Sequence, residues 1–281
     1  MVKIVTDSLS DITSDIAHGL GITVVPLTVL FGHEAYLDRV TITTDEFYRR
    51  LVNGSVWPTT TQPSPKAFAD VYEKLSADTD EILVITLSSK MSGTYQSATG
   101  GKELASKKSR VEVIDSQTVA MGLGLVVLAA AKKAREGAKL KELTDFVHHA
   151  LERSHLIIYF DTLKYLAKGG RIGKASGLLG SLLSVKPIAT VKDGEITPIT
   201  RVRSFAAGVD HVFNSVAAYP SIDSLAVEHT TNPAEADKVV ERLSSLVPKD
   251  KIVRSTVSPV IGVYAGPGAL AVTVLEAEKK W

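Results

Sequence analysis

The stretch EILVITLSSKMSGTYQSA, residues 81–98, places a short apolar run, a hydroxyl-rich loop and a helical pattern in direct succession. The run Ile82–Leu87 has the length and β-branched content of a buried strand, and a helix is expected from about Ser92. Val111–Ile114 then supplies a second strand. A helix between two strands indicates a crossover connection, so this part of the chain predicts a parallel sheet. Ligands bind such sheets at the carboxyl ends of the strands.

The same alternation of strands and helices extends over the first half of the chain. Strands are expected at Val2–Thr6 and within Ile22–Phe31, where Pro26 suggests an edge or a bend. We therefore predict that residues 1–154 form an N-terminal α/β domain with a parallel sheet and crossover helices. Its helices are expected from about Ser14 and over residues 44–51, 64–75, 118–136 and 139–153.

The pattern changes after about Ser154. The segment 187–200 predicts a hairpin that turns at Asp193-Gly194, and 164–185 predicts a helix interrupted by glycines. Residues 155–281 are therefore predicted to form a C-terminal mixed α/β domain with antiparallel strands. Its other elements are expected to be a strand at 155–161, a helix at 205–217, a strand at 224–229, a helix at 233–246 and two terminal apolar runs.

The composition excludes several classes of protein. The 281 residues carry a net charge of +1, without the basic excess of a nucleic-acid-binding protein. Cysteine is absent, which removes disulfides and thiolate chemistry and fits a reducing compartment. No apolar run reaches the about 18 residues of a membrane span, and 119–131 is expected to be a buried helix. Since residues 1–11 resemble a strand rather than a signal peptide, we expect a cytoplasmic protein.

The loop that follows residues 82–87 is a candidate anion site. Unpaired N–H groups and the helix dipole favour an anion at the start of a helix. Ser92 adds a hydroxyl group there, and Gly93 allows close approach to the backbone. The alternative is that Ser92 only caps a helix. A catalytic serine is less favoured, because KMSGT lacks the G-x-S-x-G pattern.

A second hydroxyl-rich stretch is PTTTQPSP, residues 58–65. Proline disfavours helix in the residue before it, so Thr59, Thr60 and Thr61 are expected to be extended. An extended backbone presents alternate threonines to one side. The alternative is a rigid loop before the next helix.

Two glycine-containing stretches complete the candidates. KGGRIGKASG, residues 168–177, lacks the spacing of a phosphate-binding P-loop. Its Arg171 suits a carboxylate or phosphate group, and a solvated basic surface is the alternative. In GVYAGPGAL, residues 262–270, Tyr264 brings a phenolic donor to a glycine-rich turn. A plain tight turn explains that stretch equally well.

No metal site is predicted from the sequence. His148 and His149 are adjacent and therefore point to different sides of their helix. Asp7 and Asp115 each follow a predicted strand. We expect these two carboxylates to cap helices or to tie the serine-containing loops together by hydrogen bonds.

Taken together, these stretches resemble the DegV family. VTDSLSD, TTTQPSP, LSSKMSGTYQSA, VIDSQTVAMGLG, LKYLAKGGRIG, VKPI and GPGAL occur in that family's order and spacing over essentially the whole chain. The resemblance implies two α/β domains with a long-chain fatty acid, such as palmitate or oleate, bound between them. It also implies the fatty-acid-binding subunit of a two-component fatty acid kinase. The partner of such a subunit is a separate ATP-dependent kinase subunit that phosphorylates the acid.

The family's motifs also assign residues. Carried over, the carboxylate-binding hydroxyls fall on Thr60 and Ser92, with Thr61 and Gly93 beside them. The family's arginine, associated with the carboxylate end and with the kinase partner, falls on Arg171.

One position departs from the family. Tyr264 stands where many kinase-linked members have a histidine. Its phenol can donate a hydrogen bond but carries no positive charge near neutral pH. The departure bears on the kinase partner more than on binding of the acid.

The leading hypothesis is a non-catalytic protein that binds a long-chain fatty acid for lipid transport, metabolism or presentation to a kinase. It requires no cofactor, no metal and no catalytic residue. Burial of the alkyl tail, at about 0.8 kcal/mol per methylene, would drive binding. One alternative is a phosphotransferase or hydrolase that acts through Ser92. Another is a lipid-sensing interaction module.

Overall fold

The first sheet is parallel, as the sequence predicts. The computed structural model describes residues 1–106, 109–178 and 185–278. Four strands pair in the order β2-β1-β6-β7, and every neighbouring pair in this order is parallel. Their bounds are β1 Lys3–Asp7, β2 Ile22–Val25, β6 Glu81–Thr86 and β7 Arg110–Asp115.

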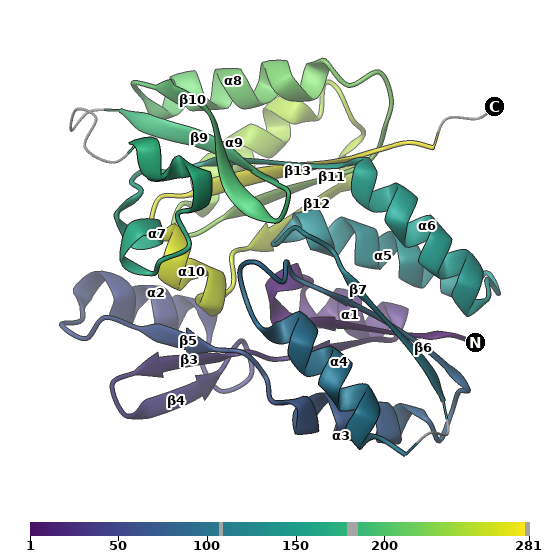
Figure 1. The fold of residues 1–281 in the computed structure, drawn as a ribbon. Coiled ribbons are helices and arrows are strands. Elements are labelled where there is room, and N and C mark those ends of the chain that lie inside the picture. Colours follow the sequence, from purple (N-terminus) through teal and green to yellow (C-terminus); the bar gives the residue numbers. More distant parts are fainter. Residues whose placement is uncertain (107–108, 179–184, 279–281) are drawn as a thin grey trace.

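Helices cover both faces of this sheet (Figure 1). On one face, α3 (Pro65–Leu75) and α4 (Thr94–Leu104) pack through Phe68, Tyr72 and Ala98 onto strand side chains such as Val84. The other face carries α1 (Ser14–Leu20), α5 (Met121–Arg135) and α6 (Leu140–Glu152).

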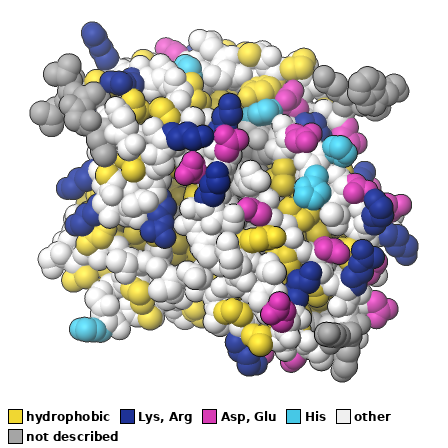
Figure 2. All heavy atoms as spheres, viewed as in Figure 1, with side chains coloured by type: hydrophobic (Ala, Val, Ile, Leu, Met, Phe, Trp, Pro, Cys, Tyr) yellow, Lys and Arg dark blue, Asp and Glu magenta, His cyan; other side chains and the backbone are white. Residues whose placement is uncertain are grey.

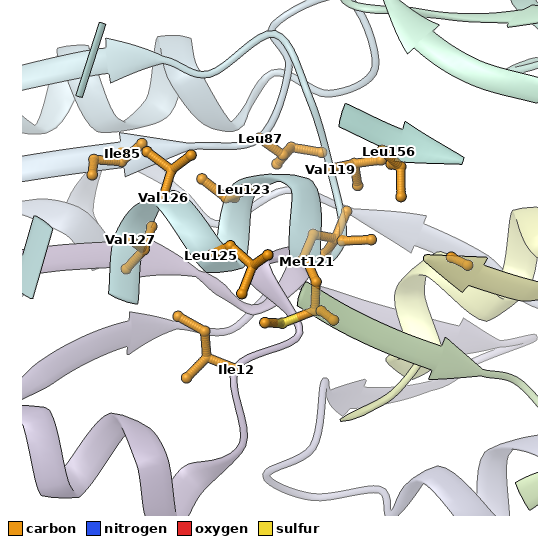
Figure 3. Packing of buried hydrophobic residues seen from close by; sticks show 14 of the residues in the cluster. Ile12, Ile85, Leu87, Val119, Met121, Leu123, Leu125, Val126, Val127 and Leu156 are labelled. Atoms are coloured by element: carbon orange, nitrogen blue, oxygen red, sulfur yellow. The ribbon is translucent and has the colours of Figure 1, made fainter. Parts of the chain in front are cut away.

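The helix α5 is buried on almost all sides because it lies between two sheets. It packs against β1 and β6 of the parallel sheet and against β8, β11 and β13 of a second sheet. Figure 3 shows its side chains pointing toward Ile85 and Leu87 on one side and toward Leu156 on another. A methyl group at Gly124 would overlap the carbonyl oxygen of Ser10. The apolar segment 119–131 thus forms the buried helix expected of it, except for its first two residues, which precede the helix.

The second sheet is mixed. Its six strands have the order β10-β9-β8-β13-β11-β12, in which β11 and β12 are parallel and the other neighbours are antiparallel. Helices α8 (Phe205–Ala217) and α9 (Pro233–Leu243) pack on the face away from α5 (Figure 1). The strand bounds are β8 Ser154–Tyr159, β9 Lys186–Lys192, β10 Glu195–Val202, β11 Ile222–His229, β12 Ile252–Thr256 and β13 Leu270–Glu276.

The predicted hairpin is confirmed. β9 and β10 pair antiparallel around Asp193 and Gly194, whose φ angles are 54° and 79°. Consecutive positive φ angles are characteristic of tight hairpin turns. All strands of the mixed sheet follow residue 153, but a division into domains at residues 154 and 155 remains a prediction.

The run Ile22–Phe31 forms two strands instead of one. It divides at Pro26, which cannot donate a ladder hydrogen bond. The second part, β3 (Thr28–Phe31), belongs to a small sheet with β4 (Glu34–Leu37) and β5 (Thr59–Thr61), in the order β4-β3-β5. Helix α2 (Thr44–Asn53) follows β4, and the hydroxyl of Thr43 accepts the N–H of Glu46 at its start.

Two short helices differ from the sequence-based expectation. The apolar segment Pro259–Ala265 is helix α10, capped by Ser258, although its content of valine and isoleucine resembles a strand. The expected helix over 164–185 begins as α7 (Lys164–Lys168) and continues as a 3-10 helix over Gly173–Leu178. Residues 179–184 of that prediction lie outside the described residues. Two more 3-10 helices span Ser8–Ser10 and Lys249–Lys251.

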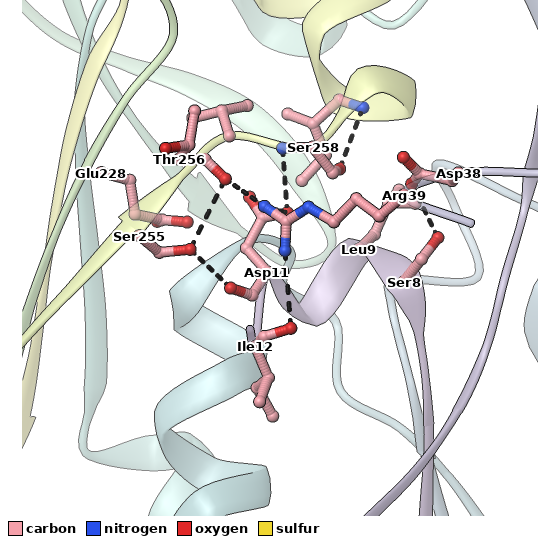
Figure 4. A network of polar contacts seen from close by, with 12 residues as sticks. Ser8, Leu9, Asp11, Ile12, Asp38, Arg39, Glu228, Ser255, Thr256 and Ser258 are labelled. Carbon is pink, nitrogen blue, oxygen red and sulfur yellow. Dashed lines mark hydrogen bonds and ion pairs between the residues drawn. The ribbon is translucent and has the colours of Figure 1, made fainter. Parts of the chain in front are cut away.

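A buried polar network joins segments that are distant in sequence (Figure 4). The Arg39 guanidinium lies 3.3 Å from Asp11 Oδ1 and donates to the carbonyl of Thr256. The backbone N–H of Ser258 donates to Asp11 Oδ1 at 3.0 Å. The network therefore holds the start of α10 against the loop that follows β1.

Glu228 on β11 completes this network in a neutral form. Burial, together with the neighbouring Asp11, raises the pKa of Glu228 well above its usual range. If both carboxyl groups were ionised, Asp11 Oδ2 and Glu228 Oε1 would have no donor within the described part of the chain. A protonated Glu228 donates to Asp11 and, through Oε2, accepts the N–H of Met121 at 3.0 Å. One buried carboxylate, Asp11, then faces one partly buried cation, Arg39.

This protonation state predicts how substitutions of Glu228 act. Glu228→Gln keeps a donor for Asp11 and an acceptor for the Met121 N–H, so the free energy of unfolding should change by less than about 1 kcal/mol. Glu228→Met fills similar space but leaves both partners unsatisfied, at a cost of roughly 2–3 kcal/mol. Urea denaturation of delipidated protein measures both values. Equal losses from the two substitutions would contradict the assignment.

Within the described ranges, no helix is long and apolar enough to cross a membrane. The same residues contain no group of three or more His, Asp or Glu side chains arranged to hold a metal ion. Acidic and basic side chains are intermixed over much of the surface in Figure 2.

Candidate functional site

A cavity lies at the carboxyl edge of the parallel sheet. The chain leaves β1 toward β2 on one side and later returns to β6 on the other, so the sheet has its topological switch point between β1 and β6. Leu9, Leu87 and Val119, which follow β1, β6 and β7, line the cavity there. Residues of β8, β10 and β13 line it from the mixed sheet, and α10 contributes as well.

The cavity is mainly apolar. The space between its lining atoms is about 890 Å³, including the part at its mouth that is open to solvent. Its apolar lining residues are Leu9, Leu27, Leu87, Met91, Val119, Ala120, Ile158, Phe160, Leu166, Ile196, Val257, Val260, Ile261, Ala265, Ala269, Leu270 and Ala271.

The polar lining residues gather at one end. They are Thr60, Gln62, Ser92, Arg171 and Tyr264. The side chains of Gln62 and Arg171 are exposed, the other three are partly buried, and most of the apolar lining is buried. The cavity therefore has a polar mouth and a hydrocarbon interior.

Thr60 and Tyr264 form a hydroxyl pair at this mouth. The Thr60 Oγ1 and Tyr264 Oη atoms lie 2.5 Å apart. Thr60 is placed by β5, which pairs with β3 opposite Val29. Tyr264 lies on α10, and its ring lies so close to Gly169 that a methyl group there would overlap it.

Ser92 lies in a loop held by carboxylates at the ends of β1 and β7, the two strands that flank β6. Asp7 accepts the N–H of Leu87 at 2.8 Å, and Asp115 accepts the N–H of Ser89 at 3.0 Å. This confirms the expectation that Asp7 and Asp115 tie the serine-containing loops together. Burial raises the pKa of Asp7 to about 7.

Ser92 itself is not the helix cap that one interpretation of the sequence suggested. Gly93 is the N-cap residue of α4, which begins at Thr94. The Ser92 Oγ atom lies 2.9 Å from Thr94 Oγ1 and accepts the Thr94 N–H at 3.3 Å. The hydroxyl therefore lines the cavity next to the first turn of the helix.

Arg171 is the cation at the mouth. Its Nε donates to the carbonyl of Met91 at 3.2 Å and its Nη1 to that of Gly169 at 2.9 Å. Its guanidinium carbon is 5.3 Å from the centre of the Tyr264 ring. These contacts connect the loop 88–93 with the segment that follows α7.

The neighbouring lysines do not line the cavity. The Lys168 Nζ lies 3.7 Å above the ring of Trp57, which stacks on Tyr165 at 4.9 Å. The Lys174 Nζ lies 3.3 Å from Asp193. Lys164 is exposed. Of the basic cluster at 164–174, Arg171 is thus the member that reaches the site.

Comparison with known proteins places the chain in a family. Residues 1–277 match the family model described as "Uncharacterised protein, DegV family". The chain belongs to the DegV family. It is 38% identical over 275 residues to a DegV domain-containing protein of Caldanaerobacter subterraneus subsp. tengcongensis. This alignment covers 96% of this chain and 97% of the relative.

Solved structures of DegV proteins share the fold. One is described as showing fatty acid binding of a DegV family protein from Thermus thermophilus; it has 30% sequence identity and a TM-score of 0.90, with 98% of this chain and 99% of the other covered. Another is DegV of Bacillus subtilis, described as a fatty acid binding protein, with 27% identity, a TM-score of 0.89 and the same coverage. The predicted DegV-like α/β fold is confirmed.

The structure brings four of the six predicted DegV site residues together. Thr60, Ser92, Arg171 and Tyr264 line the same cavity. Thr61 is exposed and does not line it, because successive residues of β5 point to opposite sides. Gly93 lies beside the cavity without lining it. The role of all six in ligand binding remains a prediction.

Gln62 is a lining residue that sequence reasoning missed. The sequence contains the information needed to find it. Alternate residues of an extended segment face the same side, so Gln62 is expected on the side of Thr60 and Thr61 on the other.

Proposed function

We propose that this DegV protein binds a long-chain fatty acid between its two predicted domains, with the alkyl tail in the apolar cavity and the carboxylate at the polar mouth. The observation that carries the proposal is the combination of an apolar interior with polar side chains gathered at one end. The Thermus thermophilus and Bacillus subtilis relatives, described as fatty-acid-binding, support the same ligand class.

The energetics favour this orientation of the ligand. Each buried methylene contributes about 0.8 kcal/mol, so the tail supplies most of the binding free energy. An isolated carboxylate in the interior would cost far more than hydroxyl groups could offset. At the mouth, Thr60, Ser92 and Tyr264 offer hydroxyl donors and Arg171 an exposed cation.

We propose that the protein has no catalytic activity of its own and needs no cofactor or metal. A serine nucleophile requires a neighbouring base. In the parts of the chain that the structure describes, Ser92 Oγ bonds to Thr94 and no His, Lys or carboxylate bonds to it. Presentation of the bound acid to an ATP-dependent fatty acid kinase subunit is the role that fits a site whose head-group end is exposed.

Ligand identification tests the proposal directly. Organic extracts of natively purified protein, or of protein reconstituted with palmitate and oleate, should contain one long-chain fatty acid per chain by mass spectrometry. Delipidated protein should take up the same amount of fatty acid per chain, whichever preparation it comes from. Absence of acid before and after reconstitution would reject the proposal.

A hydrolase or phosphotransferase would give a different result. Purified protein alone would then turn over an acyl ester or acyl phosphate, and Ser92→Ala would abolish the turnover without loss of lipid. We expect no turnover from either protein. A lipid-sensing module would instead capture a non-kinase partner only when it is loaded.

A further inference from the structure

Gln62 differs from the other polar side chains at the mouth of the cavity. Thr60 and Tyr264 form a hydrogen bond with each other, and Ser92 forms one with Thr94. Arg171 donates hydrogen bonds to two backbone carbonyl groups. Within residues 1–106, 109–178 and 185–278, the Gln62 carboxamide lines the cavity without a hydrogen-bond partner. It has donors and an acceptor available for a ligand.

The amide of Gln62 lies against the backbone beside Ser92. A methyl group built on Gly93 would lie 2.7 Å from Gln62 Nε2 and 3.1 Å from its Cδ. The carboxamide therefore packs directly on Gly93, one residue from Ser92. The φ angle of Gly93 is −73°, which any residue adopts, so the backbone conformation does not require glycine, and an added methyl group would act by displacing the end of the Gln62 side chain.

We propose that Gln62 is a further head-group contact, which donates its amide N–H to the carboxylate of the bound fatty acid, and that Gly93 is small so that this amide can lie there. This inference rests on the proposed function. A neutral amide binds a carboxylate without placing a second charge at the mouth, and it discriminates against a ligand that lacks an acceptor of that kind.

An isosteric substitution tests the contact. Gln62→Glu replaces the donor by an ionised carboxylate at about pH 8, so palmitate should bind at least about 10-fold more weakly. Hexadecan-1-ol, which has the same tail and no charge, should change by less than about twofold. Partition of the two radiolabelled ligands between phosphatidylcholine vesicles and delipidated protein measures both affinities. Equal palmitate affinity in wild type and Gln62→Glu overturns the proposal.

A double-mutant cycle tests the role of Gly93. Gln62→Leu removes the donor without adding charge, and Gly93→Ala should displace the amide. Each should weaken palmitate binding by about 3- to 10-fold. The palmitate affinity of the double variant should not fall below that of the single variant with the lower affinity. Gly100→Ala on the same helix, where an added methyl makes only ordinary contacts with Pro65 at 3.5 Å, is the matched control and should change nothing.

The outcomes separate the two proposals. Additive losses in the cycle would show that Gly93 and Gln62 act independently and would overturn the inference, while fatty-acid binding by the wild type would stand. No uptake of palmitate by the wild type would reject the proposed function and this inference with it.

Discussion

Replacement of Ala271 by phenylalanine is expected to weaken fatty-acid binding by roughly 100-fold or more while the unloaded protein stays folded. Ala271 lines the cavity on β13, opposite Ile158 of β8, which also lines it. A phenyl ring at this position occupies space that the alkyl tail needs. Exclusion of about four methylenes at about 0.8 kcal/mol each corresponds to a loss of affinity of roughly 100-fold or more.

A graded series makes this result specific. Ala271→Val, Ala271→Leu and Ala271→Phe should weaken palmitate binding progressively, and the ligand-induced rise in Tm should shrink in the same order. The Tm of delipidated protein should fall less than the affinity falls, because the new side chain extends into the cavity that Ala271 lines. Val272→Ile, on the opposite face of β13, should leave affinity unchanged. Unaltered binding in Ala271→Phe would place the tail elsewhere.

The free energy of unfolding of the delipidated protein is expected to fall as the pH rises from about 4 to about 7. Burial raises the pKa of both Asp7 and Asp38 from the ordinary value of 3.8 to about 7. Between about pH 4 and about pH 7, the carboxyl groups of Asp7 and Asp38 are ionised in the unfolded chain but protonated in the folded protein. The stabilisation contributed by Asp7 and Asp38 is therefore complete below about pH 4 and is lost as the pH rises through about 7.

The size of this effect is several kcal/mol. One pKa unit corresponds to about 1.4 kcal/mol, so each raised carboxyl contributes up to about 4 kcal/mol. Asp38→Asn should remove one contribution, because an amide oxygen can still accept the Ser8 hydroxyl, which donates to Asp38 Oδ2 at 2.7 Å. At about pH 8 the variant should be more stable than wild type, and at about pH 4 nearly equal to it.

Denaturant titrations over this pH range measure the difference between the two proteins. Asp223→Asn, at an exposed carboxyl group on β11, is the control and should follow the wild type at every pH. A parallel pH profile for Asp38→Asn and wild type would show that Asp38 ionises normally. The measurement requires delipidated protein, because a bound acid adds its own pH-dependent stabilisation.

The regular elements of the DegV fold could be predicted from the sequence because their patterns are local. Apolar runs with β-branched residues predict β1, β6, β7 and β11, and the Asp193-Gly194 turn predicts the β9–β10 hairpin. The short helix α10 was missed, since its apolar residues suit a strand as well as a helix. The cap at Ser258 and tertiary contacts decide it.

The candidate site could be predicted in part. Thr60, Ser92, Arg171 and Tyr264 were chosen from four separate stretches of the chain, and they line one cavity. Gln62 was missed, and Thr61 points away from the cavity. Which side a residue of a short strand faces depends on the register of that strand with its neighbour, here Thr60 opposite Val29.

The sequence by itself determined the parallel sheet, the hairpin, the buried helix α5 and the chemical types of the groups that could hold an acid. These depend on periodicity and on the conformational preferences of neighbouring residues. Only the tertiary structure decided that the polar groups meet at one end of an apolar cavity and that Glu228, Asp11 and Arg39 share a buried network. Such contacts join residues up to 247 positions apart, as the hydrogen bond from the Ser258 N–H to Asp11 shows. No local pattern encodes the distance between them.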